Sequence, residues 1–179
     1  MSHSLESSET KIHFNLENAP WLDRKLVHPD LIEAWSKSMK EGNLTIATLN
    51  GSFDLLHAGH LHMIHQASLQ ADILIVALNS DASIKAYKSP LRPIIPLESR
   101  LSMMAALEFV DFVTWFDETD PRTILKKIVP HVHVNGAEYG ANCIEAEVVK
   151  EGGGEIYIVE LIPGLSTSAI IEKIKTICV

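Results

Sequence analysis

Short apolar runs alternate with amphipathic segments from residue 44 to the end of the chain. The apolar runs predict strands at 44–49, 73–78, 112–116, 132–134 and 155–161, and the segments between and after them predict helices at 61–69, 97–109, 121–129, 142–151 and 167–177. The run at 73–78 is apolar throughout, as expected for a strand that is buried on both faces of a sheet. This alternation predicts an α/β fold, a Rossmann-like, doubly wound, parallel five-stranded sheet with helices on both faces.

The chain has 179 residues, which is enough for one such domain with a full core. We expect this domain at residues 43–179, preceded by an N-terminal extension, residues 1–42, with one helix. The first 20 or so residues are rich in Ser and Glu, so we expect loose order there. Pro29 and Gly42 predict a helix at 29–40. One face of this helix carries Leu31, Trp35 and Met39, which favours packing on the main domain over a contact with another subunit.

The chain is acidic, with 15 basic and 23 acidic residues and a formal net charge of −8. This balance argues against nucleic acid or an anionic membrane as a partner, and it means that any polyanionic substrate must be held by local positive potential. Cys143 and Cys178 lack the spacing of a metal site, which favours a reduced, cytoplasmic setting. The polar N-terminus is unlike a signal peptide, and the apolar runs are too short to span a membrane.

Polar or glycine-rich turns follow four of the predicted strands, at 50–60, 79–81, 135–139 and 163–168. In a parallel α/β sheet such turns gather at the carboxyl edge, where ligands bind. We therefore expect one ligand site at this edge. Its candidate binding residues are Asn50, Gly51, Ser52, Phe53, Asp54, Gly59, Asn79, Asp81, Gly136, Glu138, Ser166, Thr167 and Ser168.

The first of these turns places two histidines, His57 and His60, at a helix start. A helix start offers unpaired N–H groups and a partial positive charge to phosphate, and each imidazole can donate a ring N–H to it. A bound polyanion would favour the charged form of these rings. Gly51 and Gly59 allow close approach of the backbone to a ligand, and Asp54 can fix a histidine tautomer or help hold Mg²⁺. We therefore interpret this segment as a binding site for a nucleoside triphosphate rather than as a solvated loop.

A zinc site is the alternative for this segment, because His62 and His65 follow closely. No cysteine or nearby acidic partner completes a tetrahedral set of ligands. We therefore expect His62 and His65 on the helix surface.

The last turn places the hydroxyls of Ser166, Thr167 and Ser168 at the start of another helix. Such a group can form a second anion cradle, or it can be a plain helix N-cap, and the sequence leaves both interpretations open.

A basic loop between the second strand and the helix at 97–109 contains Lys85, Lys88, Arg92 and Arg100. It can supply the local positive field that a polyanion needs, with Lys85, Lys88 and Arg92 as candidates to clamp a transferring phosphate or a leaving pyrophosphate. A solvated charged face is the alternative. Arg100 can equally pair with Glu98 or with the neighbourhood of Glu108.

Together these residues resemble the nucleotidyltransferase superfamily that carries a His-x-Gly-His signature, here His57-Ala58-Gly59-His60. The likeness covers residues 44–177 and is closer to the D-glycero-β-D-manno-heptose 1-phosphate adenylyltransferases. It rests on the segments at 50–60, 76–83, 88–93, 96–100 and 164–168, parts of which related cytidylyltransferases share.

The resemblance implies in-line attack of a sugar 1-phosphate oxygen on the α-phosphorus of ATP, with Mg²⁺ bound to the triphosphate. Pyrophosphate leaves, and an ADP-sugar forms. It implies that His57 and His60 stabilise the α- and β-phosphates, and that Lys88 and Arg92 neutralise the substrate phosphate or pyrophosphate. It also implies that Ser166 and Thr167 hold the β- and γ-phosphates. Asn79, Asp81 and Glu138 would line the nucleotide or sugar pocket. It further implies a separate upstream sugar kinase and, by analogy, a homodimer.

One departure from this family concerns the turn after the fourth strand. The family usually has Lys-Gly-Gly-Asp-Tyr there, whereas this chain has Asn135-Gly136-Ala137-Glu138-Tyr139. Asn135 thus replaces the lysine of the family by a neutral amide, so the acceptor substrate can differ from the family's usual one. Two alternatives stay open: a cytidylyltransferase that makes a CDP-alcohol from glycerol phosphate or phosphoethanolamine, and a nucleotide-binding regulator without turnover.

Overall fold

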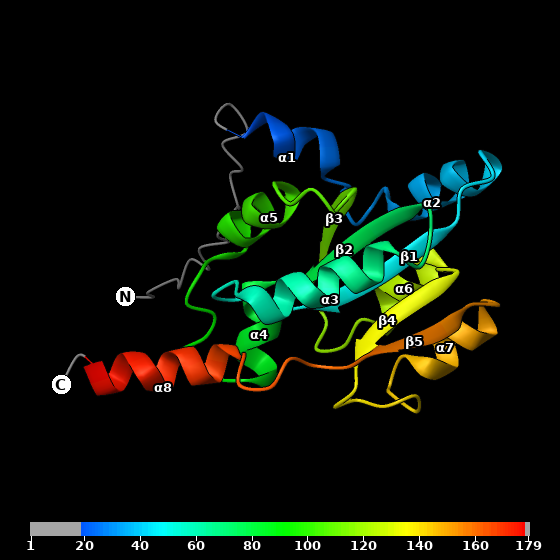
Figure 1. The fold of residues 1–179 in the computed structure, drawn as a ribbon. Coiled ribbons are helices and arrows are strands. Elements are labelled where there is room, and N and C mark those ends of the chain that lie inside the picture. Colours follow the sequence, from blue (N-terminus) through cyan, green and yellow to red (C-terminus); the bar gives the residue numbers. More distant parts are fainter. Residues whose placement is uncertain (1–18, 178–179) are drawn as a thin grey trace, which may run out of the picture.

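A computed structural model describes residues 19–177 and shows a five-stranded, wholly parallel sheet in the order β3-β2-β1-β4-β5 (Figure 1). The strands are β1 (Ile46–Gly51), β2 (Ile73–Asn79), β3 (Phe112–Phe116), β4 (Val132–Gly136) and β5 (Glu155–Val159). The helices are α1 (Pro20–Lys25), α2 (Ile32–Glu41), α3 (Ala58–Ser68), α4 (Asp81–Tyr87), α5 (Leu97–Ala105), α6 (Arg122–Ile128), α7 (Ala146–Glu151) and α8 (Thr167–Ile177). The predicted Rossmann-like fold is confirmed.

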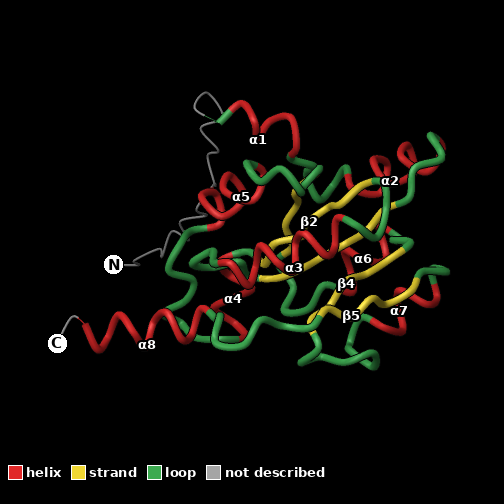
Figure 2. Tube along the Cα trace, viewed as in Figure 1, coloured by secondary structure: helices red, strands yellow, loops and turns green. Residues whose placement is uncertain are grey.

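Helices cover both faces of the sheet (Figure 2). Successive strand residues point to opposite sides, so each face presents apolar side chains that a helix buries. On one face, Ala47 and Leu49 of β1 belong to a core cluster that also takes in residues of α1, α3 and α5. On the other face, Ile46 belongs to a cluster with residues of α2 and α6. Every residue of β2 is buried, as its apolar run predicts.

The chain has two helices between residues 19 and 42 where the sequence predicted one. The six-residue α1 is too short to give a periodic signal, but Leu22 is buried and Leu26 bridges Val113 of β3. Trp35 and Met39 of α2 pack against the core as expected, whereas Leu31 lies just before the helix and is 63% exposed, so the expected packing was wrong for it. Both helices therefore pack on the sheet, while the predicted loose order of the first residues lies mostly outside the described part.

The edges of several elements differ from the prediction in ways that shape the carboxyl edge of the sheet. Strands β1 and β4 each run two residues further, so Asn50 and Gly136 are strand residues. Helix α4 was missed, and it is capped by the Ser80 side chain, which accepts from the N–H of Ser83. Helix α7 begins at Ala146 rather than at 142.

Helix α8 leaves the body of the sheet, and none of its residues is buried (Figure 1). Within the described part of the chain, no helix is both long and apolar enough to cross a membrane.

Candidate active site

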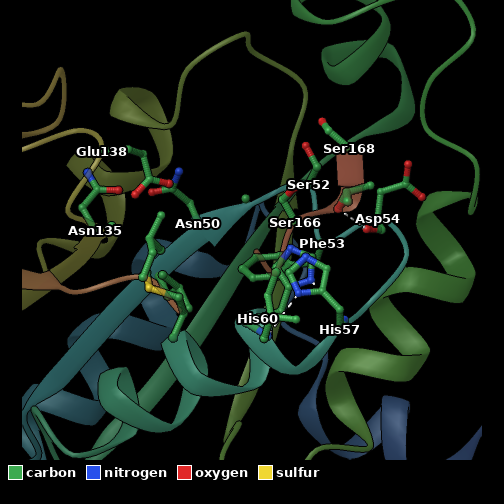
Figure 3. Close-up of a pocket in the computed structure, with 18 of the residues that line it drawn as sticks. Asn50, Ser52, Phe53, Asp54, His57, His60, Asn135, Glu138, Ser166 and Ser168 are labelled. Carbon is green, nitrogen blue, oxygen red and sulfur yellow. Dashed lines mark hydrogen bonds between the residues drawn. The ribbon is translucent and has the colours of Figure 1, made fainter. Parts of the chain in front are cut away.

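A cavity of about 400 Å³ opens at the carboxyl edge of the sheet, between the ends of β1 and β4 and the start of α8 (Figure 3). Most of the predicted site residues line it. They are Asn50, Gly51, Ser52, Phe53, Asp54, His57, Gly59, His60, Lys88, Arg92, Gly136, Glu138, Ser166, Thr167 and Ser168. The structure thus brings together four chain segments that are far apart in sequence, as the parallel topology requires.

The two histidine rings stack on one another, with centroids 3.8 Å apart and planes at 21°. His57 caps α3, and its Nδ1 accepts from the N–H of Gly59 at 3.1 Å. The Nδ1 of His60 accepts from the N–H of His57 at 3.4 Å. Because both Nδ1 atoms accept, each neutral ring carries its proton on Nε2, which can donate to a ligand.

The glycine at position 59 leaves room for this arrangement. A Cβ atom there would lie 3.0 Å from the His57 ring and 3.2 Å from the Leu165 side chain. The glycine therefore lets the α3 backbone reach the ring that caps it.

Both histidines are poised to be neutral at pH 7. Burial lowers the pKa of His57. Burial, followed by the positive charges of His57 and Lys88, lowers the pKa of His60 to about 4. A bound polyanion would act in the opposite direction and favour protonation, as expected from the sequence.

Asp54 joins three walls of the cavity. Its buried carboxylate accepts from Arg92 Nε at 2.9 Å and Nη2 at 2.7 Å, and from the N–H groups of Ile94 at 2.9 Å and Ile95 at 3.0 Å. Its backbone oxygen accepts from Thr167 Oγ1 at 2.8 Å. Burial alone would raise the pKa of Asp54, but the bonds from Ile94, Ile95 and Arg92 outweigh it and lower the pKa.

These contacts bear on the two roles that the sequence suggested for Asp54. The hydrogen bonds of its carboxylate go to the 92–95 loop, and the Nδ1 atoms of both histidines are held by backbone N–H groups instead. Four donors already surround the carboxylate, so a metal ion would have to displace one of them.

Lys88 keeps its charge available to the cavity. Its Nζ donates to Ser52 Oγ at 3.1 Å, and that hydroxyl also pairs with Tyr87 OH at 2.7 Å. Between residues 19 and 177, no ion pair involves Lys88, whereas Arg92 is paired with Asp54.

Asn79 and Asp81 do not line the cavity and instead support its walls. Asp81 accepts from Nη2 of Arg100 at 2.7 Å, and Asn79 Nδ2 donates to Ser83 Oγ at 3.0 Å. The Arg100 side chain is buried and also donates to the backbone oxygens of Ser52 and Ile95. Arg100 therefore pairs with Asp81, which α4 brings to it, and not with Glu98 or near Glu108, the partners that the sequence left open.

The hydroxyl cluster at the start of α8 acts as a helix N-cap and also faces the cavity, so it fits both interpretations of the sequence. Ser166 Oγ accepts from the N–H of Ala169 at 3.1 Å, which is a plain N-cap. Ser166, Thr167 and Ser168 also line the cavity, so the same turn is placed to meet a ligand.

The end of β4 forms the side of the cavity opposite the histidines (Figure 3). The Asn135 amide donates to Oε2 of Glu145 at 3.2 Å, and both side chains are buried. A Cβ atom at Gly136 would overlap the Glu138 carboxylate, so glycine lets that side chain fold over the strand end.

Several lining residues were missed from the sequence. They are Leu49, Met63, Asn135, Tyr139, Leu161, Ile162 and Leu165. Asn135 and Tyr139 lie in a turn that had been singled out, and Met63 follows His60 by three residues on α3, so position alone could have indicated them. The apolar residues of the 161–165 segment carry no such signal.

The zinc alternative has no support in the described residues, where no group of three or more His, Cys, Asp or Glu side chains is placed to hold a metal ion. His65 instead packs edge-on against Phe109, with ring centroids 4.8 Å apart.

Comparison with known proteins bears on the family. A family described as cytidylyltransferase-like matches residues 48–173. The bifunctional protein HldE of Azorhizobium caulinodans is 40% identical over 147 residues, and that of Ectopseudomonas mendocina is 44% identical over 131. These matches cover 82% and 73% of this chain but only 30% and 28% of the two HldE proteins.

Two solved structures are similar to this fold. A lipopolysaccharide core biosynthesis protein from Thermoplasma volcanium has a TM-score of 0.53 at 26% identity, over 66% of this chain and 97% of that one. A pantoate-beta-alanine ligase from Francisella tularensis has a TM-score of 0.59 at 15% identity, over 83% of this chain and 72% of that one, and supports the fold alone. With the histidine signature at the carboxyl edge and a family match over most of the chain, the protein belongs to the cytidylyltransferase-like family.

Proposed function

We propose that the protein transfers AMP from ATP to a sugar 1-phosphate, D-glycero-β-D-manno-heptose 1-phosphate, and releases an ADP-sugar and pyrophosphate. The observation that carries this proposal is the stacked pair His57 and His60, with both Nδ1 atoms held by backbone N–H groups and both Nε2 atoms left to donate at the start of α3. The sequence similarity to the HldE proteins, and to a protein described as acting in lipopolysaccharide core biosynthesis, supports the choice of acceptor.

The attacking oxygen belongs to a phosphate that is already an anion, so no strong general base is needed. Catalysis then consists of positioning and of neutralising charge on the transferring phosphate. His57 and His60 donate to the α- and β-phosphates, and Lys88 supplies the positive charge that faces the departing pyrophosphate. Arg92 contributes through the Asp54 pair, which holds the basic loop against the histidine turn.

The start of α8 is the proposed site for the β- and γ-phosphates. Ser166 and Ser168 line the cavity there, and Thr167 is tied to Asp54. We propose that Mg²⁺ enters with ATP and is held mainly by the triphosphate, since no group of three or more His, Cys, Asp or Glu side chains among the described residues is placed to hold it and the Asp54 carboxylate is already engaged.

The proposal is tested by measuring pyrophosphate release with ATP or CTP across a panel of phosphorylated acceptors. The panel contains the heptose 1-phosphate, other sugar 1-phosphates, glycerol phosphate and phosphoethanolamine. Turnover with ATP and a sugar 1-phosphate is expected. Turnover restricted to CTP and an alcohol phosphate would favour the cytidylyltransferase alternative, which the family description keeps open. Tight ATP binding without turnover would favour a regulator, the alternative that Asn135 keeps open.

A further inference from the structure

Lys88 reaches the cavity from the end of α4. Of the lysine and arginine side chains among the described lining residues, Arg92 is paired with Asp54, whereas Lys88 has no carboxylate partner. A lysine side chain has high rotamer freedom, and binding a phosphate costs this freedom unless other contacts fix the side chain beforehand. The contacts of Lys88 within the protein therefore determine how effectively its charge can act on a ligand.

Two contacts fix the Lys88 ammonium, and both involve Tyr87, the last residue of α4. Lys88 Nζ donates to Ser52 Oγ at 3.1 Å, and the Ser52 hydroxyl shares a second hydrogen bond with Tyr87 OH at 2.7 Å. The same Nζ lies 5.3 Å from the centroid of the Tyr87 ring, within the range of a cation–π contact. Because an ammonium group only donates, Ser52 Oγ is the acceptor in the first bond, whichever hydroxyl donates in the second.

Ser52 gives this arrangement a firm support, because both ends of α4 are tied to it. The residue directly follows β1 and is 6% exposed. Its backbone oxygen accepts from Nη1 of Arg100 at 2.6 Å, and Arg100 is paired with Asp81 at the start of α4. Its hydroxyl meets Tyr87 at the other end of the helix. The Lys88 ammonium is thus connected to the end of the central strand of the sheet.

We propose that Tyr87 is a positioning residue, which holds the Lys88 ammonium in place at the cavity through the Ser52 hydroxyl and through its own ring. Tyr87 is not among the residues that line the cavity, so it acts on a ligand through these two neighbours. The proposal rests on the proposed function, in which Lys88 faces the departing pyrophosphate. An ammonium that is already in place meets the phosphate oxygens without reorganisation, so loss of the Tyr87 hydroxyl should weaken phosphate binding and slow the transfer.

The test is a double-variant cycle on Tyr87 and Lys88. Tyr87→Phe removes the hydroxyl and keeps the ring, and since Tyr87 is 43% exposed the variant should fold normally. Lys88→Gln removes the charge that Tyr87 is proposed to hold. If Tyr87 acts through Lys88, its replacement has no further effect once Lys88 is replaced, whereas a merely structural role would give additive losses. Tyr157→Phe on β5, an exposed tyrosine that does not line the cavity, is the matched control.

Calorimetry with inorganic pyrophosphate and Mg²⁺ measures binding without any need for turnover. Tyr87→Phe should weaken binding about fivefold and Lys88→Gln about tenfold or more, because the second variant also removes the charge. The double variant should bind pyrophosphate within about twofold of Lys88→Gln, and Tyr157→Phe should match the unchanged protein. In turnover, Tyr87→Phe should lower kcat about fivefold and leave KM for the acceptor within about twofold of the unchanged value.

Unchanged pyrophosphate affinity in Tyr87→Phe overturns the positioning role. An equal loss that persists in the Lys88→Gln background also overturns it, because Tyr87 then acts independently of Lys88, and so does a failure of the unchanged protein to bind pyrophosphate.

Failure of the proposed function gives a different result. If ATP is turned over with no acceptor but the binding cycle shows the coupling, the proposed reaction is wrong and the positioning role of Tyr87 stands. Normal turnover without the coupling overturns the positioning role and leaves the reaction standing.

Discussion

Arg92 and Asp54 form a largely buried ion pair that ties the basic loop to the histidine turn, with Arg92 Nη2 2.7 Å from Asp54 Oδ2. The Asp54 side chain is 1% exposed and that of Arg92 is 17% exposed. A cation that the sequence assigned to phosphate thus has a carboxylate partner within the protein, and the pair holds the 92–95 loop to the turn that contains Asp54.

Breaking this ion pair should lower both the stability of the protein and its rate of turnover. Asp54→Asn leaves the Arg92 charge without its partner, so we expect the free energy of unfolding to fall by about 3 kcal/mol. Urea unfolding at pH 7 measures the change. The double variant Asp54→Asn/Arg92→Gln removes the orphaned charge and should recover part of the loss; a loss equal to the sum of the single variants would contradict the coupling.

His60→Ala should lower kcat by a factor of about 10²–10³, because it removes the ring that we propose to donate to the transferring phosphates. A coupled assay of pyrophosphate release measures this loss, and circular dichroism checks that the variant still folds. His62→Ala, on the same helix but outside the cavity lining, is the control and should keep near-normal turnover.

Gly59→Ala should impair the site through geometry, since the added Cβ would press on the His57 ring at 3.0 Å. We expect kcat/KM to fall at least tenfold while the far-ultraviolet spectrum is unchanged. The control is Gly42→Ala, whose Cβ would meet the Met39 oxygen at 3.2 Å at the end of α2, away from the cavity. Equal turnover in the two variants would argue against a role for the His57 ring position.

Acid should destabilise the fold through His133, which is fully buried and pairs with Thr48 across β1 and β4. Burial lowers the pKa of His133 to about 3, below the unfolded value of about 6.5. Between these values the unfolded chain binds more protons, so stability is complete above pH 6.5 and declines as the pH falls toward 3.

At pH 4 the loss from His133 should reach about 3 kcal/mol relative to pH 7. The double variant Thr48→Val/His133→Leu replaces both partners by apolar side chains and should flatten this part of the pH dependence. Urea unfolding at pH 7 and pH 4 checks it, and an unchanged slope would show that His133 is not the titrating group.

The sequence was most informative where a pattern is local. Strand β3 and helix α8 begin and end at the predicted residues. The run of β-branched and aromatic residues in β3, and the hydroxyl residues at the start of α8, indicate these ends within the segments themselves. Helix α4 escaped notice since its seven residues lie between a polar turn and a proline-rich loop.

Contacts between distant segments had no local signal. The Asp54–Arg92 and Asp81–Arg100 pairs join residues 38 and 19 positions apart, and only the packed fold shows which carboxylate meets which guanidinium. The same holds for Asn135 and Glu145, whose hydrogen bond depends on the turn between β4 and α7. Placement at the carboxyl edge was predictable for both histidines, whereas their stacking was not.

The most direct test of the account follows the α-phosphate of ATP. With [α-³²P]ATP, Mg²⁺ and D-glycero-β-D-manno-heptose 1-phosphate, the label should appear in an ADP-sugar, and a parallel reaction with [γ-³²P]ATP should release labelled pyrophosphate. Label that stays in ATP, or that appears in ADP and inorganic phosphate, would contradict nucleotidyl transfer to this acceptor.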